Sequence, residues 1–280
     1  MAAKILVIGG SGTVGRHLVA ELAAKGEQVR LATRRPTASA RSNVESVKLD
    51  LSSGQGLPEA FEGVDRVFAL SPAGYLDQPG LISPVVEEAT RRGAKVVLQT
   101  AMGVDADDNI PFRQLELKLE RAGVPYVILR PNWFTDNFDT YWGAQIASGA
   151  LRLPAGEGAT SFIDARDIAA SAAGALTSAD HDNQAFDLTG PEALTYAQAA
   201  EIISRETGLP VRYENVNAET FVRGRVQAGV PEDYARFLAT ILGVVAQGWT
   251  AKVVDGVERL SGRKPRTLAD HFREKRQLAA

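Results

Sequence analysis

Lys4-Ile5-Leu6-Val7-Ile8-Gly9-Gly10-Ser11-Gly12-Thr13-Val14-Gly15 is the stretch that decides the fold of this 280-residue chain. Its first part, residues 4–8, is an apolar run rich in branched side chains, which predicts a central parallel strand covered on both faces. From residue 13 to residue 25 apolar side chains recur at helical spacing, and Gly26 supplies a stop. The sequence therefore predicts a strand, a tight glycine turn and a helix in direct succession.

The glycines of this turn have the spacing Gly-x-x-Gly-x-x-Gly. Glycine permits a tight turn and lets the backbone approach a pyrophosphate, whose charge then lies against amide N–H groups at the positive end of the helix. An ordinary glycine-rich turn could show the same spacing, but its position directly after such a strand favours a dinucleotide site. We expect the loop to bind through Gly9, Ser11, Gly12, Thr13, Val14 and Gly15.

The second expected strand ends in Thr33-Arg34-Arg35-Pro36. Proteins of this architecture that are specific for NAD carry an acidic residue here, which accepts hydrogen bonds from the ribose. A guanidinium instead pairs with a ribose 2′-phosphate, which a carboxylate would repel. The sequence therefore predicts NADP(H), with Arg34 the better candidate for the contact and Arg35 beside it; the alternative is a solvated basic loop.

Strands alternate with helices along the first half of the chain. Helical patterns include residues 112–121, which end before Gly123. Such alternation predicts an α/β fold with a Rossmann-type, doubly wound parallel sheet. The further strands expected are residues 28–33, 44–49, 66–70, 95–99 and 126–129.

After Pro131 the pattern is less regular and predicts a smaller C-terminal α/β substrate lobe. We expect an NAD(P)-binding domain over residues 1–150 and a substrate lobe over residues 151–280, interleaved with the first domain. Helical stretches in that second part are expected at residues 167–176, 196–207, 218–228, 231–246 and 267–275.

Several further residues follow the expected strands, at the carboxyl edge where the ligand crevice of such sheets opens. Asp50 could bond the adenine amino group, or equally cap the turn that follows it. The residues expected at this edge are Asp50, Leu51, Leu70, Ser71, Pro72 and Thr100.

Composition limits the classes of partner that we expect this chain to bind. The chain has 45% hydrophobic residues and a net charge of −3 from 31 basic and 34 acidic residues, so no strong field favours nucleic acid or anionic lipid. It has no cysteine, which excludes thiolate chemistry. Its apolar runs are too short for a signal peptide or a membrane span, and we expect a cytoplasmic protein with a small-molecule partner. Residues 237–245 could pack within the lobe or against a second copy in a homodimer.

Several runs resemble the NmrA-like group of atypical short-chain dehydrogenases/reductases, which includes quinone, triphenylmethane and ergot-alkaloid-type reductases. The resemblance covers nearly the whole chain and implies a Rossmann lobe, a small substrate lobe, and nicotinamide near Pro131. Besides the glycine loop and the arginine pair it rests on residues 63–68, on Leu129-Arg130-Pro131-Asn132-Trp133-Phe134-Thr135-Asp136-Asn137-Phe138, and on residues 161–169 and 187–191.

The chain departs from the catalytic pattern of the broader superfamily. That pattern pairs Tyr-x-x-x-Lys on one helix face, so that the lysine lowers the pKa of the tyrosine. On the corresponding helix we read Phe112 and Glu116 instead, and Thr100 is the one hydroxyl directly after the fifth strand. We therefore assign no catalytic residue. The isolated His17, His181 and His271 support neither a metal site nor a histidine base.

Aromatic residues gather after the sixth strand. They could form an apolar pocket that stacks a flat acceptor over nicotinamide, or pack a junction between lobes. The candidates are Trp133, Phe134, Asn137 and Tyr141.

Two functions follow from this reading. One is an NADPH-dependent reductase whose planar quinone-like, dye-like or iminium acceptor needs little acid help, so that positioning supplies much of the rate. The other is a non-catalytic NADP(H) sensor that binds a regulatory protein partner. The retained substrate-lobe runs favour the reductase.

Overall fold

The computed structural model of the chain describes residues 4–279, which form two compact units. The first unit contains the described residues up to Pro131, together with Ala165–Leu188 and Gly256–Arg263. The second contains Asn132–Asp164, Thr189–Asp255 and the described residues from Lys264 onward. Each unit is thus assembled from three segments. The domain boundary expected at residue 150 stays a prediction, since compactness does not show which segments fold independently.

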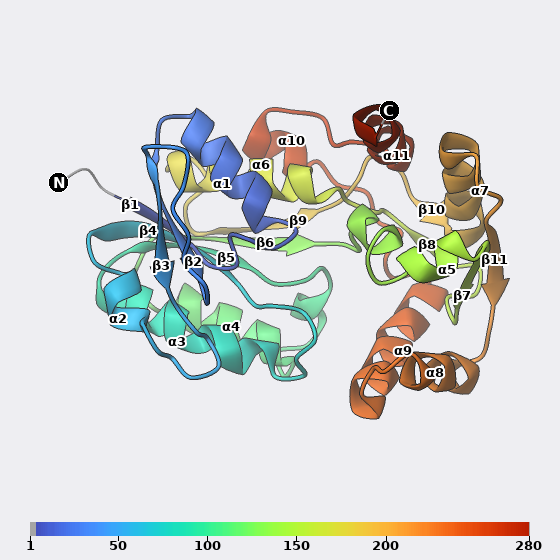
Figure 1. The fold of residues 1–280 in the computed structure, drawn as a ribbon. Coiled ribbons are helices and arrows are strands. Elements are labelled where there is room, and N and C mark those ends of the chain that lie inside the picture. Colours follow the sequence, from blue (N-terminus) through green and yellow to red (C-terminus); the bar gives the residue numbers. More distant parts are fainter. Residues whose placement is uncertain (1–3, 280) are drawn as a thin grey trace. The chain divides into compact units, whose positions relative to one another are not determined.

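A seven-stranded parallel sheet forms the centre of the first unit, in the order β3-β2-β1-β4-β5-β6-β9 (Figure 1). The strand order reverses between β1 and β4, which is the topological switch point where such sheets bind ligands. The strands are β1 (Lys4–Val7), β2 (Gln28–Thr33), β3 (Val44–Lys48), β4 (Val64–Leu70), β5 (Lys95–Gln99), β6 (Tyr126–Pro131) and β9 (Gln184–Leu188). The expected α/β fold with a parallel Rossmann-like sheet is confirmed.

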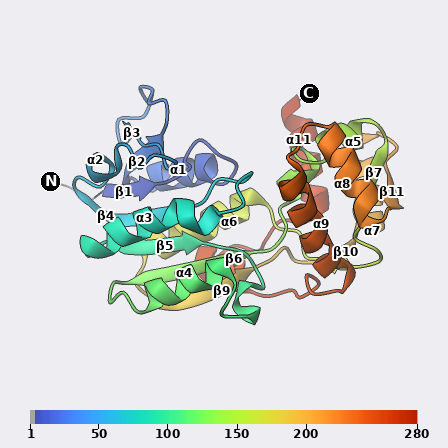
Figure 2. The same cartoon turned by 90° about the horizontal axis from the view of Figure 1, so that it is seen from below.

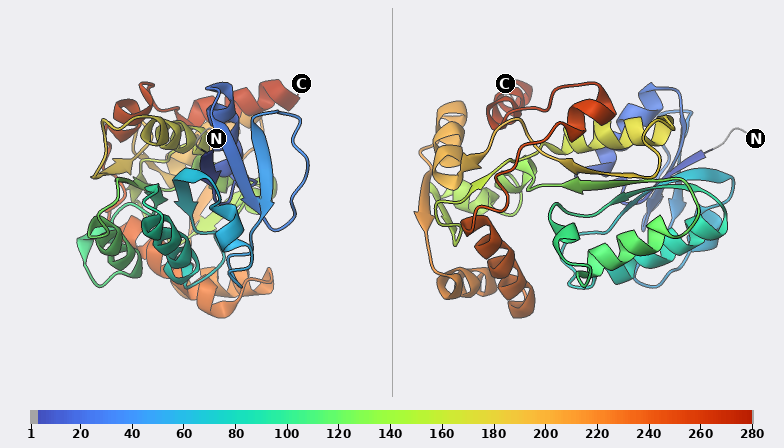
Figure 3. Two further views of the ribbon diagram at one scale, coloured as in Figure 1. Left: turned by 90° about the vertical axis from the view of Figure 1, so that its left-hand side faces the viewer. Right: turned by 180° about the vertical axis from the view of Figure 1, so that it is seen from behind.

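Helices cover both faces of this sheet (Figure 2). Side chains alternate along a strand, so Leu6 of β1 packs in the cluster beneath one set of helices while Ile5 and Val7 face the other; all three are fully buried. One face carries α1 (Gly15–Ala24), α6 (Ala165–Thr177) and α10 (Gly256–Ser261), and the other α2 (Leu57–Ala60), α3 (Gln78–Arg91) and α4 (Pro111–Glu120). In Figure 3 the yellow α6 and the green α4 lie on opposite sides of the sheet.

The second unit packs helices around two small sheets. Its aromatic core brings Phe138, Trp142, Phe162 and Tyr196 together, with ring centroids 5.1–6.3 Å apart. The strands are β7 (Ala150–Leu153) paired with β11 (Arg212–Asn215), and β8 (Ala159–Thr160) paired with β10 (Leu194–Thr195). The helices are α5 (Gly143–Ala147), α7 (Tyr196–Thr207), α8 (Ala218–Gln227), α9 (Glu232–Ala246) and α11 (Leu268–Ala279).

None of the helices within residues 4–279 combines the length and apolar character needed to span a bilayer.

Candidate functional site

The glycine loop closes tightly onto the start of α1. Gly9 has φ +69°, and its carbonyl accepts a hydrogen bond of 2.8 Å from the Gly12 amide. A Cβ built on Gly15 would lie 2.2 Å from the Gly9 carbonyl oxygen, and one on Gly10 would lie 2.0 Å from Cδ1 of Leu31. The Gly15 contact is with backbone, which cannot move aside, so this turn requires glycine at that position.

The same loop leaves donors unused at the N-terminus of α1. Helix α1 has no side-chain cap and no acidic residue in its first turn. Within residues 4–279, the amides of Ser11, Thr13 and Val14 donate no hydrogen bond. Amides that have no partner at a positive helix end form the kind of cradle that binds a phosphate.

The arginine pair follows β2 at the same edge of the sheet. Arg34 and Arg35 are exposed, and neither guanidinium forms an ion pair or side-chain hydrogen bond within the described part of the chain. Asp50 follows β3, and its Oδ1 accepts from the Ser52 hydroxyl at 2.6 Å and the Ser52 amide at 3.0 Å. These bonds lower the pKa of Asp50, and the charge of Arg34 adds a smaller effect. Asp50 thus caps its turn, and its contact with adenine stays a prediction.

Two buried polar atoms lie at the ends of neighbouring strands. Ser71 follows β4, and Gln99 ends β5, where it pairs with Leu70. Ser71 Oγ and Gln99 Oε1 are buried, and neither has a hydrogen-bond partner among residues 4–279. Buried polar groups are nearly always satisfied, so these two atoms point to a polar ligand at this edge.

All the residues expected to hold the cofactor therefore lie in the first unit, along the carboxyl edge of the sheet. Leu70 lies beside the loop, since its Cδ2 would be 3.5 Å from a Cβ built on Gly9. Leu51 is half-buried, Pro72 is exposed, and Pro131 is buried at the end of β6. The glycine cradle, the unused amides and the two orphaned atoms together fit an NAD(P)H dinucleotide, and Arg34 and Arg35 stand at the same edge.

A buried ionic network surrounds Glu116 of α4. Glu116 on α4 is fully buried and accepts hydrogen bonds from Thr100 Oγ1 (2.7 Å), Arg113 (3.0 Å) and both Nε (3.0 Å) and Nη2 (2.6 Å) of Arg130. Arg130 also bonds Asp105 at 2.5 Å. Burial opposes the charge of Arg130, but Glu116 raises its pKa, so the arginine stays cationic. The negative charge of Glu116 is thus paired with two arginines inside the first unit.

The expected acceptor residues all lie in the second unit. Trp133 is half-buried and stacks on Trp142, with 5.8 Å between ring centroids, so it contributes to the core as well as to the surface. Phe134 and Asn137 are half-buried, and the Asn137 carbonyl accepts from the Trp142 amide at 2.9 Å. Tyr141 is 38% exposed, and its hydroxyl is hydrogen-bonded to Tyr234.

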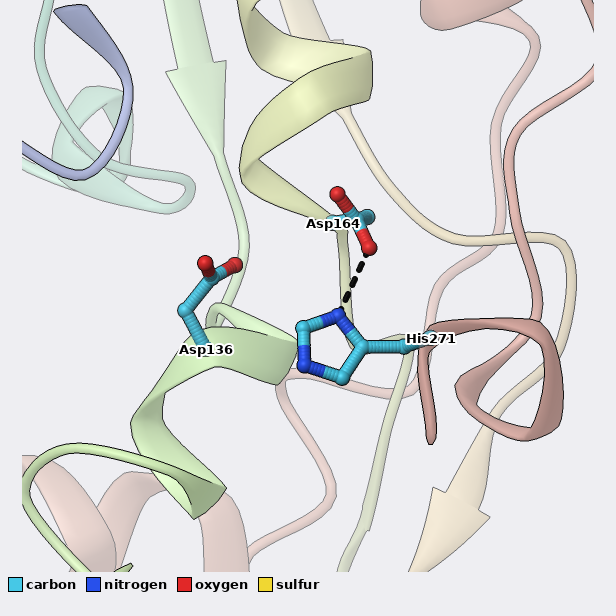
Figure 4. Close-up of side chains that lie close together, drawn as sticks. All are labelled: Asp136, Asp164 and His271. Atoms are coloured by element: carbon cyan, nitrogen blue, oxygen red, sulfur yellow. Dashed lines mark hydrogen bonds and ion pairs between the residues drawn. The ribbon is translucent and has the colours of Figure 1, made fainter. Parts of the chain in front are cut away.

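A second polar cluster in this unit joins residues that are far apart in sequence (Figure 4). Potential ligand atoms of Asp136, Asp164 and His271 lie within 4.8 Å of one another. The imidazole Nδ1 lies 2.7 Å from Asp164 Oδ2, and Nε2 lies 2.7 Å from Asp139 Oδ2. Carboxylates on both nitrogens require a doubly protonated ring. His271 thus forms ion pairs with Asp139 and Asp164 in this structure.

Burial alone would lower the pKa of His271, but the hydrogen bonds to Asp139 and Asp164 raise it to about 9. Sequence reasoning had no local signal for this network, since the pairs are separated by more than 100 residues. The Glu116 network did have one, because Arg130 stands inside an apolar strand and a buried charge needs a partner.

Comparisons with known proteins agree with the geometry. A model of the NmrA-like family matches residues 1–274. The NAD(P)H azoreductase of Xenophilus azovorans is 34% identical over 278 residues, covering 95% of this chain and 96% of the relative. The triphenylmethane reductase of Citrobacter sp. complexed with NADP(H) matches with TM-score 0.79 and 26% identity over 97% of this chain and 99% of its own. The quinone oxidoreductase QOR2 of Escherichia coli complexed with NADPH has TM-score 0.85 at 22% identity, with the same coverage, which shows a shared fold.

Proposed function

The chain belongs to the NmrA-like family, and on that basis we propose that it is an NADPH-dependent reductase acting on a planar quinone-like, dye-like or iminium acceptor. The observation that carries the proposal is the pairing of an unused phosphate cradle with unpaired Arg34 and Arg35 at one edge of the sheet. A relative that is an NAD(P)H azoreductase, at 34% identity over nearly the full length of both chains, supports the reductase class.

The residues of the first unit have separate tasks in this proposal. The amides of Ser11, Thr13 and Val14 bind the pyrophosphate, and Arg34 binds the 2′-phosphate. Ser71 and Gln99 supply polar atoms toward the ribose and nicotinamide end of the sheet edge. NADPH bound in this way would supply the hydride that reduces the acceptor.

The acceptor class follows from what this chain lacks. Phe112 and the neutralised Glu116 stand at the helix positions of the superfamily's acid and base. An acceptor that is already electrophilic, or that delocalises the developing charge, needs orientation more than a tuned acid. The aromatic residues Trp133, Phe134 and Tyr141 of the second unit, with Asn137, are proposed to bind its flat ring.

The test is a fluorescence titration of the purified protein with NADPH and NADH, followed by addition of neutral quinones and cationic dyes. We expect tighter binding of NADPH and a loss of its absorbance that depends on acceptor. If NADPH binds tightly but no acceptor in a broad panel is reduced, the reductase proposal fails and the sensor function takes its place. If neither dinucleotide binds, the cofactor assignment fails as well.

A further inference from the structure

Arg225 on α8 is a cation that has no counter-ion in the described part of the chain. Its Nη1 donates to the backbone carbonyl of Tyr141 at 3.3 Å, and its Nε is buried with no hydrogen-bond partner in the described chain. No carboxylate among residues 4–279 forms an ion pair with it. An unsatisfied nitrogen on a half-buried guanidinium is costly, which is why such groups normally have an oxygen partner.

The carboxylates on the neighbouring elements are engaged elsewhere. Glu219 of α8 and Glu232 of α9 both bind Arg236, at 3.0 Å and 2.8 Å. Asp233 accepts a hydrogen bond of 2.8 Å from the Tyr234 amide at the start of α9. None of these three carboxylates pairs with Arg225, so its charge is available to a bound anion.

Two phenols stand beside this cation. The hydroxyls of Tyr141 and Tyr234 share a hydrogen bond, and burial together with that bond raises the pKa of Tyr141 to about 12, although the charge of Arg225 opposes the rise. Tyr141 is thus protonated near neutral pH. A protonated phenol can donate its O–H to an oxygen acceptor.

Apolar surface adjoins the polar groups. Tyr234 is buried and its ring lies 6.0 Å from that of Phe237, which is 42% exposed. Tyr141 and Val226 are 38% and 40% exposed. Helices α8 and α9, which carry most of these residues, lie side by side (Figures 1 and 2). A flat aromatic molecule could cover this surface while an oxygen substituent reaches the cation.

We propose that Arg225, Tyr141 and Tyr234 form a recognition site for an anionic oxygen substituent, a sulfonate or carboxylate, carried on a planar aromatic acceptor. This inference rests on the proposed reductase function, because it names the class of acceptor. Guanidinium and phenol donors suit an oxyanion, and the exposed rings suit the aromatic body that carries it. The site thus favours an arylsulfonate or arylcarboxylate over the same molecule without the anionic substituent.

Binding can be tested without turnover. Isothermal titration of the full chain with naphthalene-2-sulfonate and with its neutral isostere naphthalene-2-sulfonamide gives a ratio of two affinities. Arg225→Gln should lower that ratio at least tenfold, the size of a lost charge-assisted hydrogen bond. Tyr234→Phe should lower it less, by about threefold to tenfold. The matched control is Arg223→Gln, an exposed arginine two positions away on the same helix, which should leave the ratio unchanged.

Further measurements distinguish specific recognition from misfolding of a variant and from binding of an adventitious ion only. In the unaltered protein, added NaCl should weaken binding of the sulfonate but not of the sulfonamide, because only sulfonate binding depends on a charge pair. Arg225→Lys keeps the positive charge, so its ratio of sulfonate affinity to sulfonamide affinity should fall between those of the unaltered protein and Arg225→Gln. An unchanged ratio in Arg225→Gln, or inorganic sulfate competing as well as the arylsulfonate, would overturn the proposal.

Turnover separates this proposal from the function on which it rests. With NADPH, the KM ratio of 1,2-naphthoquinone-4-sulfonate to 1,2-naphthoquinone should rise at least tenfold in Arg225→Gln. If neither quinone is reduced, the reductase proposal fails, and the affinity ratios from the titrations still test the recognition site. If both are reduced and the ratio is unaltered, the site fails alone.

Discussion

Raising the pH from 6.5 to 9 should remove about 3 kcal/mol from the free energy of unfolding of the second unit, because His271 is held there as an imidazolium. The ring lies between Asp164 and Asp139, and Lys275 lies 2.7 Å from the other oxygen of Asp139. His271 and Asp164 are almost wholly buried, with side chains 9% and 1% exposed. Water therefore screens the pairing little.

The magnitude follows from the difference in proton affinity between the folded and unfolded chains. The pKa of His271 is raised from 6.5 to about 9 in the folded protein, which corresponds to about 3 kcal/mol of stabilisation. Between these values the folded state binds more protons than the unfolded one. The stabilisation is thus complete below pH 6.5 and is lost as the pH rises through 9.

The assay exploits the position of the tryptophans. The chain has three, Trp133, Trp142 and Trp249, and all lie in the second unit together with His271. Urea unfolding followed by tryptophan fluorescence at pH 6, 7.5 and 9 therefore reports the unit that contains the network. His271→Gln should be less stable at pH 6 and should lack most of the decline with pH.

His181→Gln is the matched control, since that histidine lies in the first unit and contacts the ring of Phe186. This variant should keep the pH dependence of the unaltered protein. A free energy of unfolding that is flat or rises between pH 6.5 and 9, or an undiminished decline in His271→Gln, would refute the imidazolium assignment.

Three further predictions concern the first unit. Arg34→Glu should weaken NADPH about a hundredfold and reverse the preference over NADH, because it replaces a charge-assisted bond with repulsion; unchanged NADPH affinity in a fluorescence titration would contradict the assignment. Gly15→Ala should weaken NADPH binding at least tenfold and lower the thermal midpoint of unfolding, because the new Cβ would lie 2.2 Å from the Gly9 carbonyl oxygen. Gly26→Ala is the control for loss of a glycine without a clash, because its Cβ would meet open space although its φ is +82°. Equal losses of NADPH affinity in both variants would argue against the cradle. Glu116→Gln should cost about 3–5 kcal/mol in urea unfolding, because Arg130 keeps its charge in a buried position; a loss below 1 kcal/mol would show that Asp105 alone compensates that charge.

Much of the first unit can be predicted from the sequence, because neighbouring residues mark its strands, its turns and the ends of its helices. Runs such as residues 4–8 are apolar on both faces, and glycine stops mark the adjoining helices, so six strands were placed close to their observed bounds. The sequence does not predict strand β9 (Gln184–Leu188), because only two of its five residues are buried and a polar residue separates them, so no apolar run marks the strand. The strands of the second unit have only two to four residues, too few for a period of two to be visible.

The candidate site likewise contains some residues that the sequence predicts and others that it does not. The glycine loop and Arg34 stand out because their roles depend on neighbours in sequence, and the structure places both at one sheet edge. The contacts of Arg225 with Tyr141, of Glu116 with Thr100, and of His271 with two aspartates depend on which distant segments the fold brings together. A single sequence carries no record of those contacts, so they required the coordinates.

The segmented first unit also constrains how the chain can fold during synthesis. Its edge strand β9 pairs with β6 only after residues 132–164 have been made, and α10 packs on α6 only after most of the second unit has followed. A nascent chain ending near Pro131 would leave the backbone groups along one side of β6 unpaired, an edge prone to join other chains. Completion of the nucleotide-binding sheet is thus a late event on the ribosome, and expressing residues 1–131 alone should give an aggregating fragment rather than a minimal cofactor-binding domain.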